Sequence, residues 1–133
     1  MLGASKPSQT EELPSPSELI GMGWLYALHA RSSIARGRVW QAEYVISGMR
    51  DQVLALACLR HRLPVFEGRG MDRLPAEILD SILPALVESL DRPELQRAIE
   101  AAGEALLAEA QQIGPSLTGH IGATVRALSS RER

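Results

Sequence analysis

The sequence predicts an all-α fold, an antiparallel helical bundle of four helices plus a weak fifth. Apolar residues recur at helical spacing along the chain, and no segment has the period-2 alternation that is typical of a half-buried strand. The segment from Val53 to Leu59 is apolar on every side. Because a helix that is hydrophobic all round has to be enclosed by other helices, we expect this segment at the centre of the bundle.

The first two helices are expected to form an antiparallel hairpin. Ser15 is a good N-cap residue, Pro16 suits the first helical position, and Glu18 completes a capping box. This helix should stop at Gly37, since glycine commonly follows the end of a helix. The second helix should run over residues 39–63 and end before the next proline.

The second half of the chain contains a loop and two further helices. Residues 64–74 form the one long loop, which is expected to be functional or mobile. A third helix is expected over residues 75–90, with a kink at Pro84, because proline removes a backbone hydrogen bond and crowds the preceding turn. The sequence Asp-Arg-Pro-Glu at residues 91–94 is a second capping signal, and Gly114-Pro115 should end the fourth helix.

The last segment is predicted to be a weak helix. Its apolar residues have helical spacing over residues 115–130, but Gly119 and Gly122 lower the helix propensity, so we expect a weak helix there. We expect the helical bundle domain to span residues 15–130. The flanking residues 1–14 and 131–133 are expected to be a disordered tail or linker remnant and a short tail.

Size and composition are those of one globular domain. The chain has 133 residues, of which 45% are hydrophobic and 23% charged. Its longest apolar run, residues 53–59, is far shorter than the ~18 residues that cross a bilayer, so no membrane association is expected. The single cysteine, Cys58, lies on an apolar turn and should be a buried core residue. Together these features predict a cytoplasmic protein.

Charge is divided unevenly along the chain. Residues 29–73 contain eight arginines and four acidic residues, a net charge of +4, whereas residues 74–125 contain eight acidic residues and two arginines, a net charge of −6. The difference indicates an anionic ligand for the first half, or docking of the two halves on each other or on a partner. The simpler explanation is that the two oppositely charged halves of one bundle are each solvated.

The best candidate for a binding site is one face of the second helix. Glu43, Ser47, Arg50 and Asp51 follow one another at spacings of four, three and one residues, which places them on adjoining positions. A carboxylate beside an arginine at the border of a buried region is suited to hold a polar ligand or to act as a general base. The alternative is a solvated face with a weak ion pair inside the helix.

Two aromatic residues, Trp40 and Tyr44, flank this face one turn apart. Such a pair is suited to core or dimer contacts, or to stacking against a base or a sugar. No metal site is predicted, because the three histidines fall on separate elements without a carboxylate or thiol at ligand spacing. Neither a catalytic triad nor a phosphate-binding loop is present in the sequence.

The run GWLYALHARSSIARGRVWQAEYVISGMRDQVLALACLRHRLPVFEGRGMDRLP, residues 23–75, resembles the helical C-terminal region of bacterial nucleotidyltransferases of the polymerase-β-like superfamily. The resemblance extends over residues 17–110 and concerns pattern and helix order. It implies a helical bundle that completes a substrate pocket beside a catalytic α/β domain and often mediates dimerisation. Members of that superfamily adenylylate aminoglycosides and lincosamides, using ATP and magnesium bound to the catalytic domain.

The sequence departs from this family at the catalytic motifs. It has no Gly-Ser dipeptide, and none of its four aspartates has an acidic residue two positions later, so the Asp-x-Asp metal pair is missing. The resemblance therefore implies a substrate-binding or accessory half that is not catalytic alone, binds no cofactor alone and works with a separate catalytic domain. In that half, Glu43 would be the candidate base, and Arg50 and Arg69 would contact the substrate or its phosphate. The face of the second helix adds Tyr44, Ser47 and Asp51, together with Glu43, as candidate contacts of a small polar substrate.

Two other classes of function remain open from the sequence. HEPN proteins share the helical shape, but no arginine precedes a histidine here at the spacing that HEPN ribonucleases use, and the overall acidity disfavours nucleic acid as a partner. A purely structural module would use Trp24, Tyr26, Trp40 and Tyr44 as aromatic anchors of a homodimer.

Overall fold

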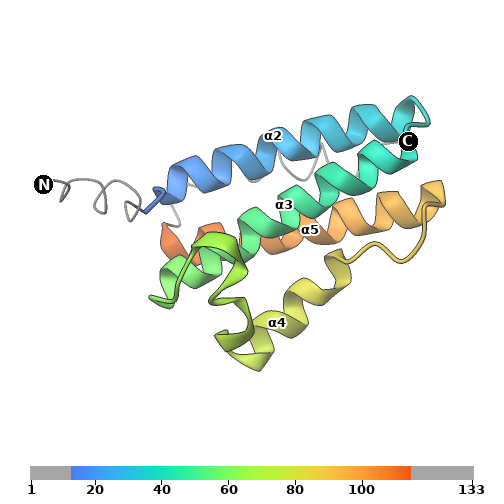
Figure 1. Cartoon of the computed structure of the whole chain (residues 1–133). Coiled ribbons are helices and arrows are strands. Elements are labelled where there is room, and N and C mark those ends of the chain that lie inside the picture. Colours follow the sequence, from blue (N-terminus) through green and yellow to red (C-terminus); the bar gives the residue numbers. More distant parts are fainter. Residues whose placement is uncertain (1–12, 115–133) are drawn as a thin grey trace, which may run out of the picture.

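The computed structural model describes residues 13–114, which fold as an all-α bundle (Figure 1). The predicted fold class is confirmed. The tail predicted at residues 1–14 lies almost entirely outside the described residues, and the weak helix predicted at 115–130 and the tail at 131–133 lie wholly outside them. The described helices are α2 (Pro16–Ala35), α3 (Val39–Arg60), α4 (Ala76–Ile82) and α5 (Arg92–Ile113), with short 3₁₀ helices η1 (Phe66–Gly68), η2 (Met71–Arg73) and η3 (Leu83–Ala85).

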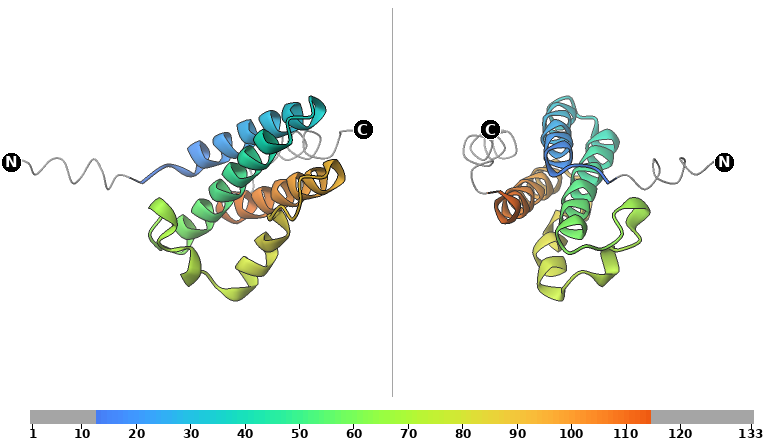
Figure 2. Two further views of the ribbon diagram at one scale, coloured as in Figure 1. Left: turned by 45° about the vertical axis from the view of Figure 1, so that its right-hand side comes forward. Right: turned by 90° about the vertical axis from the view of Figure 1, so that its left-hand side faces the viewer.

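The long helices α2, α3 and α5 form the body of the described bundle. Helices α2 and α3 make an antiparallel hairpin, and α5 packs against both of them (Figure 1, Figure 2). The short helix α4 lies on the side of α3 and α5 away from α2, with the loop of η1 and η2 beside it (Figure 2). None of the described helices has the length and hydropathy that crossing a bilayer requires.

The largest side chains that are fully buried come from α3 and α5, and they define the centre of the core. The apolar segment at residues 53–59 lies in this core as predicted, with Leu54 and Leu59 half-buried and the other five residues buried. The thiol of Cys58 is enclosed, and burial raises its pKa, with a smaller contribution from the charge of Glu109. These large buried core residues are Ile46, Met49, Val53, Leu56, Cys58, Leu95, Ile99 and Leu106.

Both ends of α2 have the geometry that the sequence predicts. The Ser15 hydroxyl accepts a hydrogen bond from the Glu18 backbone N–H at 3.1 Å, and the Glu18 carboxylate accepts one from the Ser15 N–H at 3.0 Å. At the other end, Gly37 has φ 73°, and the Arg38 N–H bonds the Ser33 carbonyl oxygen at 2.8 Å. This is a Schellman motif, in which glycine adopts the left-handed conformation at no steric cost.

Helix α3 ends at Arg60, three residues before the predicted end. Arg62 adopts φ 60°, and the Leu63 N–H bonds the Cys58 carbonyl oxygen at 2.8 Å. The same Schellman geometry therefore ends α3 with an arginine at the left-handed position. Because arginine is not a typical residue for that position, this helix end could not be predicted from the residue type.

The third helix is shorter than predicted. The prediction of a kinked helix over residues 75–90 is wrong in its second half, since α4 ends at Ile82, the 3₁₀ turn η3 contains Pro84, and the backbone is extended at Leu86. Proline blocks the α-helical bond at this point. Because the α-helix does not continue, the carbonyl groups that follow have no helical partners, and the guanidinium of Arg97 donates to two of them, those of Pro84 at 2.8 Å and Leu86 at 2.9 Å.

Helix α5 begins at Arg92 as predicted, but its N-terminus is satisfied differently. Asp91 occupies the N-cap position without a side-chain cap bond. The Glu94 carboxylate instead accepts a hydrogen bond from the Glu88 N–H at 2.8 Å and pairs with Arg97 at 2.7 Å. The second capping signal therefore predicts the start of the helix correctly. Its glutamate, Glu94, bonds the backbone of the segment that precedes α5.

Candidate functional site

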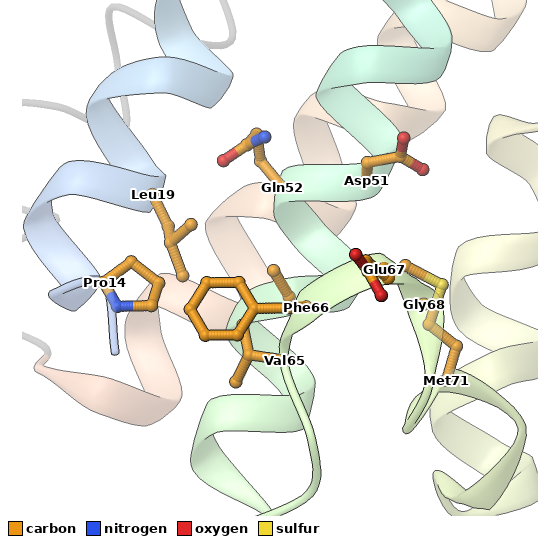
Figure 3. A pocket seen from close by; sticks show the side chains of 10 residues that line it. Pro14, Leu19, Asp51, Gln52, Val65, Phe66, Glu67, Gly68 and Met71 are labelled. Carbon is orange, nitrogen blue, oxygen red and sulfur yellow. The ribbon is translucent and has the colours of Figure 1, made fainter. Parts of the chain in front are cut away.

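A groove of about 590 Å³ lies where the start of α2, the second half of α3 and the loop after α3 meet (Figure 3). The segment before α2 and its first turn contribute Pro14 and Leu19, and α3 contributes Asp51, Gln52 and Ala55. The loop supplies the remaining wall. Its contribution consists of Val65, Phe66, Glu67, Gly68 and Met71.

The loop wall is held by buried anchors and by a close backbone approach. Val65 and Leu74 are buried at its two ends. A β-carbon on Gly70 would lie 2.5 Å from the Pro64 carbonyl oxygen, so only glycine allows this contact. Glu67 adopts φ 61° between the anchors. The segment predicted to be a functional or mobile loop is therefore an ordered pair of 3₁₀ turns that contributes residues to the groove.

The two sides of the groove differ in polarity. Figure 3 shows the apolar side chains of Pro14, Leu19 and Phe66 on one side and the carboxylates of Asp51 and Glu67 on the other. An apolar concavity with a few placed polar groups is the usual form of a small-molecule site.

The two acidic groups are in different environments. Much of the Asp51 side chain is exposed, yet surrounding protein withdraws water from its carboxyl group and raises its pKa, against a smaller lowering by the charge of Arg50. Glu67 forms an ion pair with Arg69 at 2.7 Å, in which both side chains are exposed. Such an exposed pair adds little stability, so Glu67 is free to exchange its partner for a ligand.

The structure separates the predicted face of α3 into two parts. The Ser47 hydroxyl donates a hydrogen bond to the Glu43 carboxylate at 2.9 Å, which agrees with their predicted neighbourhood. Arg50 donates to the Ala85 carbonyl oxygen at 3.4 Å, and within residues 13–114 it forms no ion pair with Glu43. Of these four predicted residues, only Asp51 lines the groove.

The other predicted contacts also lie outside the groove lining. Arg69 reaches the site only through its bond to Glu67. Tyr44 and Trp40 are 73% and 75% exposed on α3, so they are not core residues. Across the part of the chain that the structure describes, no group of three or more acidic, histidine or cysteine side chains is arranged to hold a metal ion.

Sequence reasoning missed the apolar side of the groove. Leu19 belongs to the apolar part of the first helix and Gln52 to a polar stretch of the second, so neither has a sequence pattern that indicates a site. Their proximity to the loop depends on the packed fold. Phe66 carried a usable signal, since it is the one phenylalanine in the sequence and follows a proline-valine pair in a loop. An aromatic residue at that position is 42% exposed here, as expected for a residue that forms the wall of a site.

Comparison with known proteins provides no relative. No protein-family model matches the sequence, and no curated protein or solved structure matches it either.

Proposed function

We propose that the chain is a helical ligand-binding module, the substrate-binding or accessory half of a nucleotidyltransferase-type protein, without chemistry of its own. The observation that carries the proposal is the groove between α2, α3 and the loop of η1 and η2. Its volume falls within the range of small-molecule sites, and the close contact of Gly70 with the Pro64 carbonyl oxygen fixes the backbone of its loop wall. A preformed wall lowers the entropy cost of binding.

The nucleotidyltransferase part of the proposal is supported by the sequence resemblance over residues 17–110. In this arrangement a separate catalytic domain or chain supplies the carboxylates that bind magnesium and ATP, and the bundle presents the substrate to it. The Asp51 and Glu67 carboxylates of the groove are the polar groups that would orient a substrate. The single, buried Cys58 is consistent with the cytoplasm as the proposed compartment.

A thermal-shift screen of the full chain tests this function. The ligand classes are nucleotides with magnesium, aminoglycosides, and short RNA. A ligand at 100 times its Kd adds about 2.7 kcal/mol to the free energy of unfolding. We expect one small-molecule class to raise the Tm.

Matched variants assign any such shift to the groove. Gln52→Trp fills the groove from α3, and Gln41→Trp places the same side chain on an exposed position of the same helix outside it. The shift should be lost in Gln52→Trp and kept in Gln41→Trp. A shift that persists in Gln52→Trp, or a response to RNA alone, would contradict the proposed function.

A second candidate function, a structural dimerisation module, is favoured by the exposure of Trp40 and Tyr44. Two large aromatic side chains one turn apart, each about three-quarters exposed, are typical anchors of protein interfaces. Light scattering after gel filtration distinguishes this function. A dimer that Trp40→Ala and Tyr44→Ala convert to a monomer supports it, and a wild-type chain that is monomeric at about 100 μM, a protomer concentration at which micromolar dimers are populated, contradicts it.

A further inference from the structure

The charges at the groove select between classes of ligand. Its ten lining residues include two carboxylates, Asp51 and Glu67, and no lysine, arginine or histidine. Of the nearest arginines in the sequence, Arg50 donates to the Ala85 carbonyl oxygen, and Arg69 pairs with the groove carboxylate of Glu67 through an exposed contact that a ligand cation can replace. An anionic ligand would meet carboxylate charge in the groove, whereas a cationic ligand would be attracted into it.

Asp51 is the stronger of the two candidates for a cation partner. Within residues 13–114 it forms no ion pair, and the groove walls withdraw water from it enough to raise its pKa. A partly dehydrated carboxylate without a contact ion pair gains more from a ligand cation than a fully hydrated one does. Glu67, which lies on the loop, adds a second acceptor on the same side of the groove as Asp51.

The apolar side selects for a second property of the ligand. Pro14, Leu19 and the ring of Phe66 lie together opposite the carboxylates (Figure 3). Phe66 is 42% exposed, so a ligand that covers its ring removes apolar surface from water on both partners. A purely hydrophilic polycation would pair with the carboxylates but would leave this apolar surface exposed to water.

We propose that the groove binds a protonated amine carried on an apolar body, with the ammonium on the side of Asp51 and Glu67 and the body against Phe66. This inference rests on the groove being the binding site of the proposed function, and it adds the chemical class of the ligand. Asp51 is the main charge partner, and Phe66 is the main apolar partner.

A probe series with one apolar body and three head groups tests the inference. The probes are 4-phenylbutylamine, 4-phenylbutanol and 4-phenylbutyrate, with spermidine as a cation that lacks the apolar body. Binding to the full ¹⁵N-labelled chain is followed by the shifts of backbone amides. We expect 4-phenylbutylamine to move the amides of residues 51–55 and 65–71, and to bind about fivefold more tightly than the alcohol, the size of effect expected for one exposed ion pair.

Variants distinguish the contribution of the charge contact at Asp51 from that of the apolar contact at Phe66. Asp51→Asn should reduce the affinity of the amine to that of the alcohol, while Asp80→Asn, an exposed acidic residue of α4 outside the groove, should leave it unchanged. Phe66→Ala should weaken the amine and the alcohol alike. Because Asp51 and Phe66 are both exposed, these changes leave the core intact, and the amide spectrum verifies that directly.

The outcomes that overturn the inference differ from those that overturn the site. Equal binding of the alcohol or the butyrate at the same amides would refute the cationic class and leave the groove as a binding site. Binding of spermidine as tight as that of the amine would refute the apolar body. Absence of groove shifts with all four probes would refute both the ligand class and the proposed site.

Discussion

The guanidinium of Arg60 donates two parallel hydrogen bonds to the carboxylate of Glu109, from Nε to Oε1 and from Nη2 to Oε2, each 3.0 Å long. The pair joins the last turn of α3 to the C-terminal part of α5. The Glu109 side chain is only 6% exposed, whereas the Arg60 side chain is 24% exposed. The carboxylate therefore depends on this one arginine for most of its hydrogen bonding, and the bidentate geometry fixes how the two helices meet.

Removal of Arg60 should be costly because it leaves a buried charge without a partner. We expect Arg60→Met to lower the free energy of unfolding by about 2–3 kcal/mol. The double variant Arg60→Met/Glu109→Met should recover most of that loss, since no buried charge remains. Urea unfolding followed by circular dichroism measures both. The exposed Arg73→Met is the control, and an Arg60→Met variant as stable as this control would contradict the prediction.

Two glycine-to-alanine substitutions should change the stability of the protein in opposite directions. Alanine at Gly70 places its β-carbon 2.5 Å from the Pro64 carbonyl oxygen, so the loop wall must shift, at a cost of about 1–3 kcal/mol. Alanine at Gly21 of α2 meets no atom within 4 Å and should stabilise the helix by about 1 kcal/mol. Thermal unfolding gives both values. If Gly70→Ala kept wild-type stability and ligand binding, the loop would not be the fixed wall described here.

The end of α3 offers a stabilising substitution. Arg62 has φ 60°, a left-handed conformation that costs an ordinary residue about 1–2 kcal/mol and costs glycine nothing. The greater freedom of glycine in the unfolded chain offsets part of the gain, which leaves about 0.5 kcal/mol of stabilisation for Arg62→Gly. Arg36→Gly is the matched control, because Arg36 has φ −92° and should gain nothing. A lower urea midpoint for Arg62→Gly than for the wild type would refute this account.

The pair of Glu94 and Arg97 predicts how stability depends on pH. Hydrogen bonds from Arg97, and then from the Glu88 N–H, lower the pKa of Glu94 from 4.5 to about 2. A carboxyl group whose pKa is lower in the folded state stabilises that state above its ordinary pKa. Its contribution disappears as the pH falls from 4.5 towards 2.

The variant Glu94→Gln should therefore be less stable than the wild type at pH 7, and the difference should shrink as the pH falls from about 5 to about 2. Urea midpoints at several pH values measure this difference. Glu77→Gln, at an exposed position of α4, serves as the control. A difference between Glu94→Gln and the wild type that stayed constant over this range would show that the ion pair is not the source of the stabilisation.

Local signals in the sequence predicted most of the fold. Ser15 and Gly37 bounded α2 because capping and left-handed glycine act within a few residues of the chain. Pro84 marks a disturbance in the sequence, but the helix ends there instead of bending, because Arg97 of the later helix α5 bonds the carbonyl oxygens of Pro84 and Leu86 in the non-helical segment. The left-handed conformation of Arg62 could not be predicted, because that conformation is typical of glycine and not of arginine.

The candidate site was harder to predict, because it is built from segments that meet only in the packed fold. Asp51 was identified from its helical neighbours, and the bond between Glu43 and Ser47 follows from their spacing of four residues. Phe66 and Leu19 come together only when the loop folds back onto the start of α2. Helical spacing could not foresee that Arg50 bonds Ala85 rather than Glu43, since that partner lies thirty-five residues away.

The shortness of α4 has a consequence for how the native molecule opens. Ile82 is its one buried residue, and the following turn η3 adds only Ala85, whereas α2, α3 and α5 each bury several residues, so comparatively little apolar surface opposes detachment of residues 76–90. The amide hydrogens of α4 should exchange with solvent through local opening, whereas those in the middle of α3 and α5 should exchange only on global unfolding. Such an opening must break the hydrogen bonds by which Arg97 of α5 and Arg50 of α3 hold carbonyl groups of this segment.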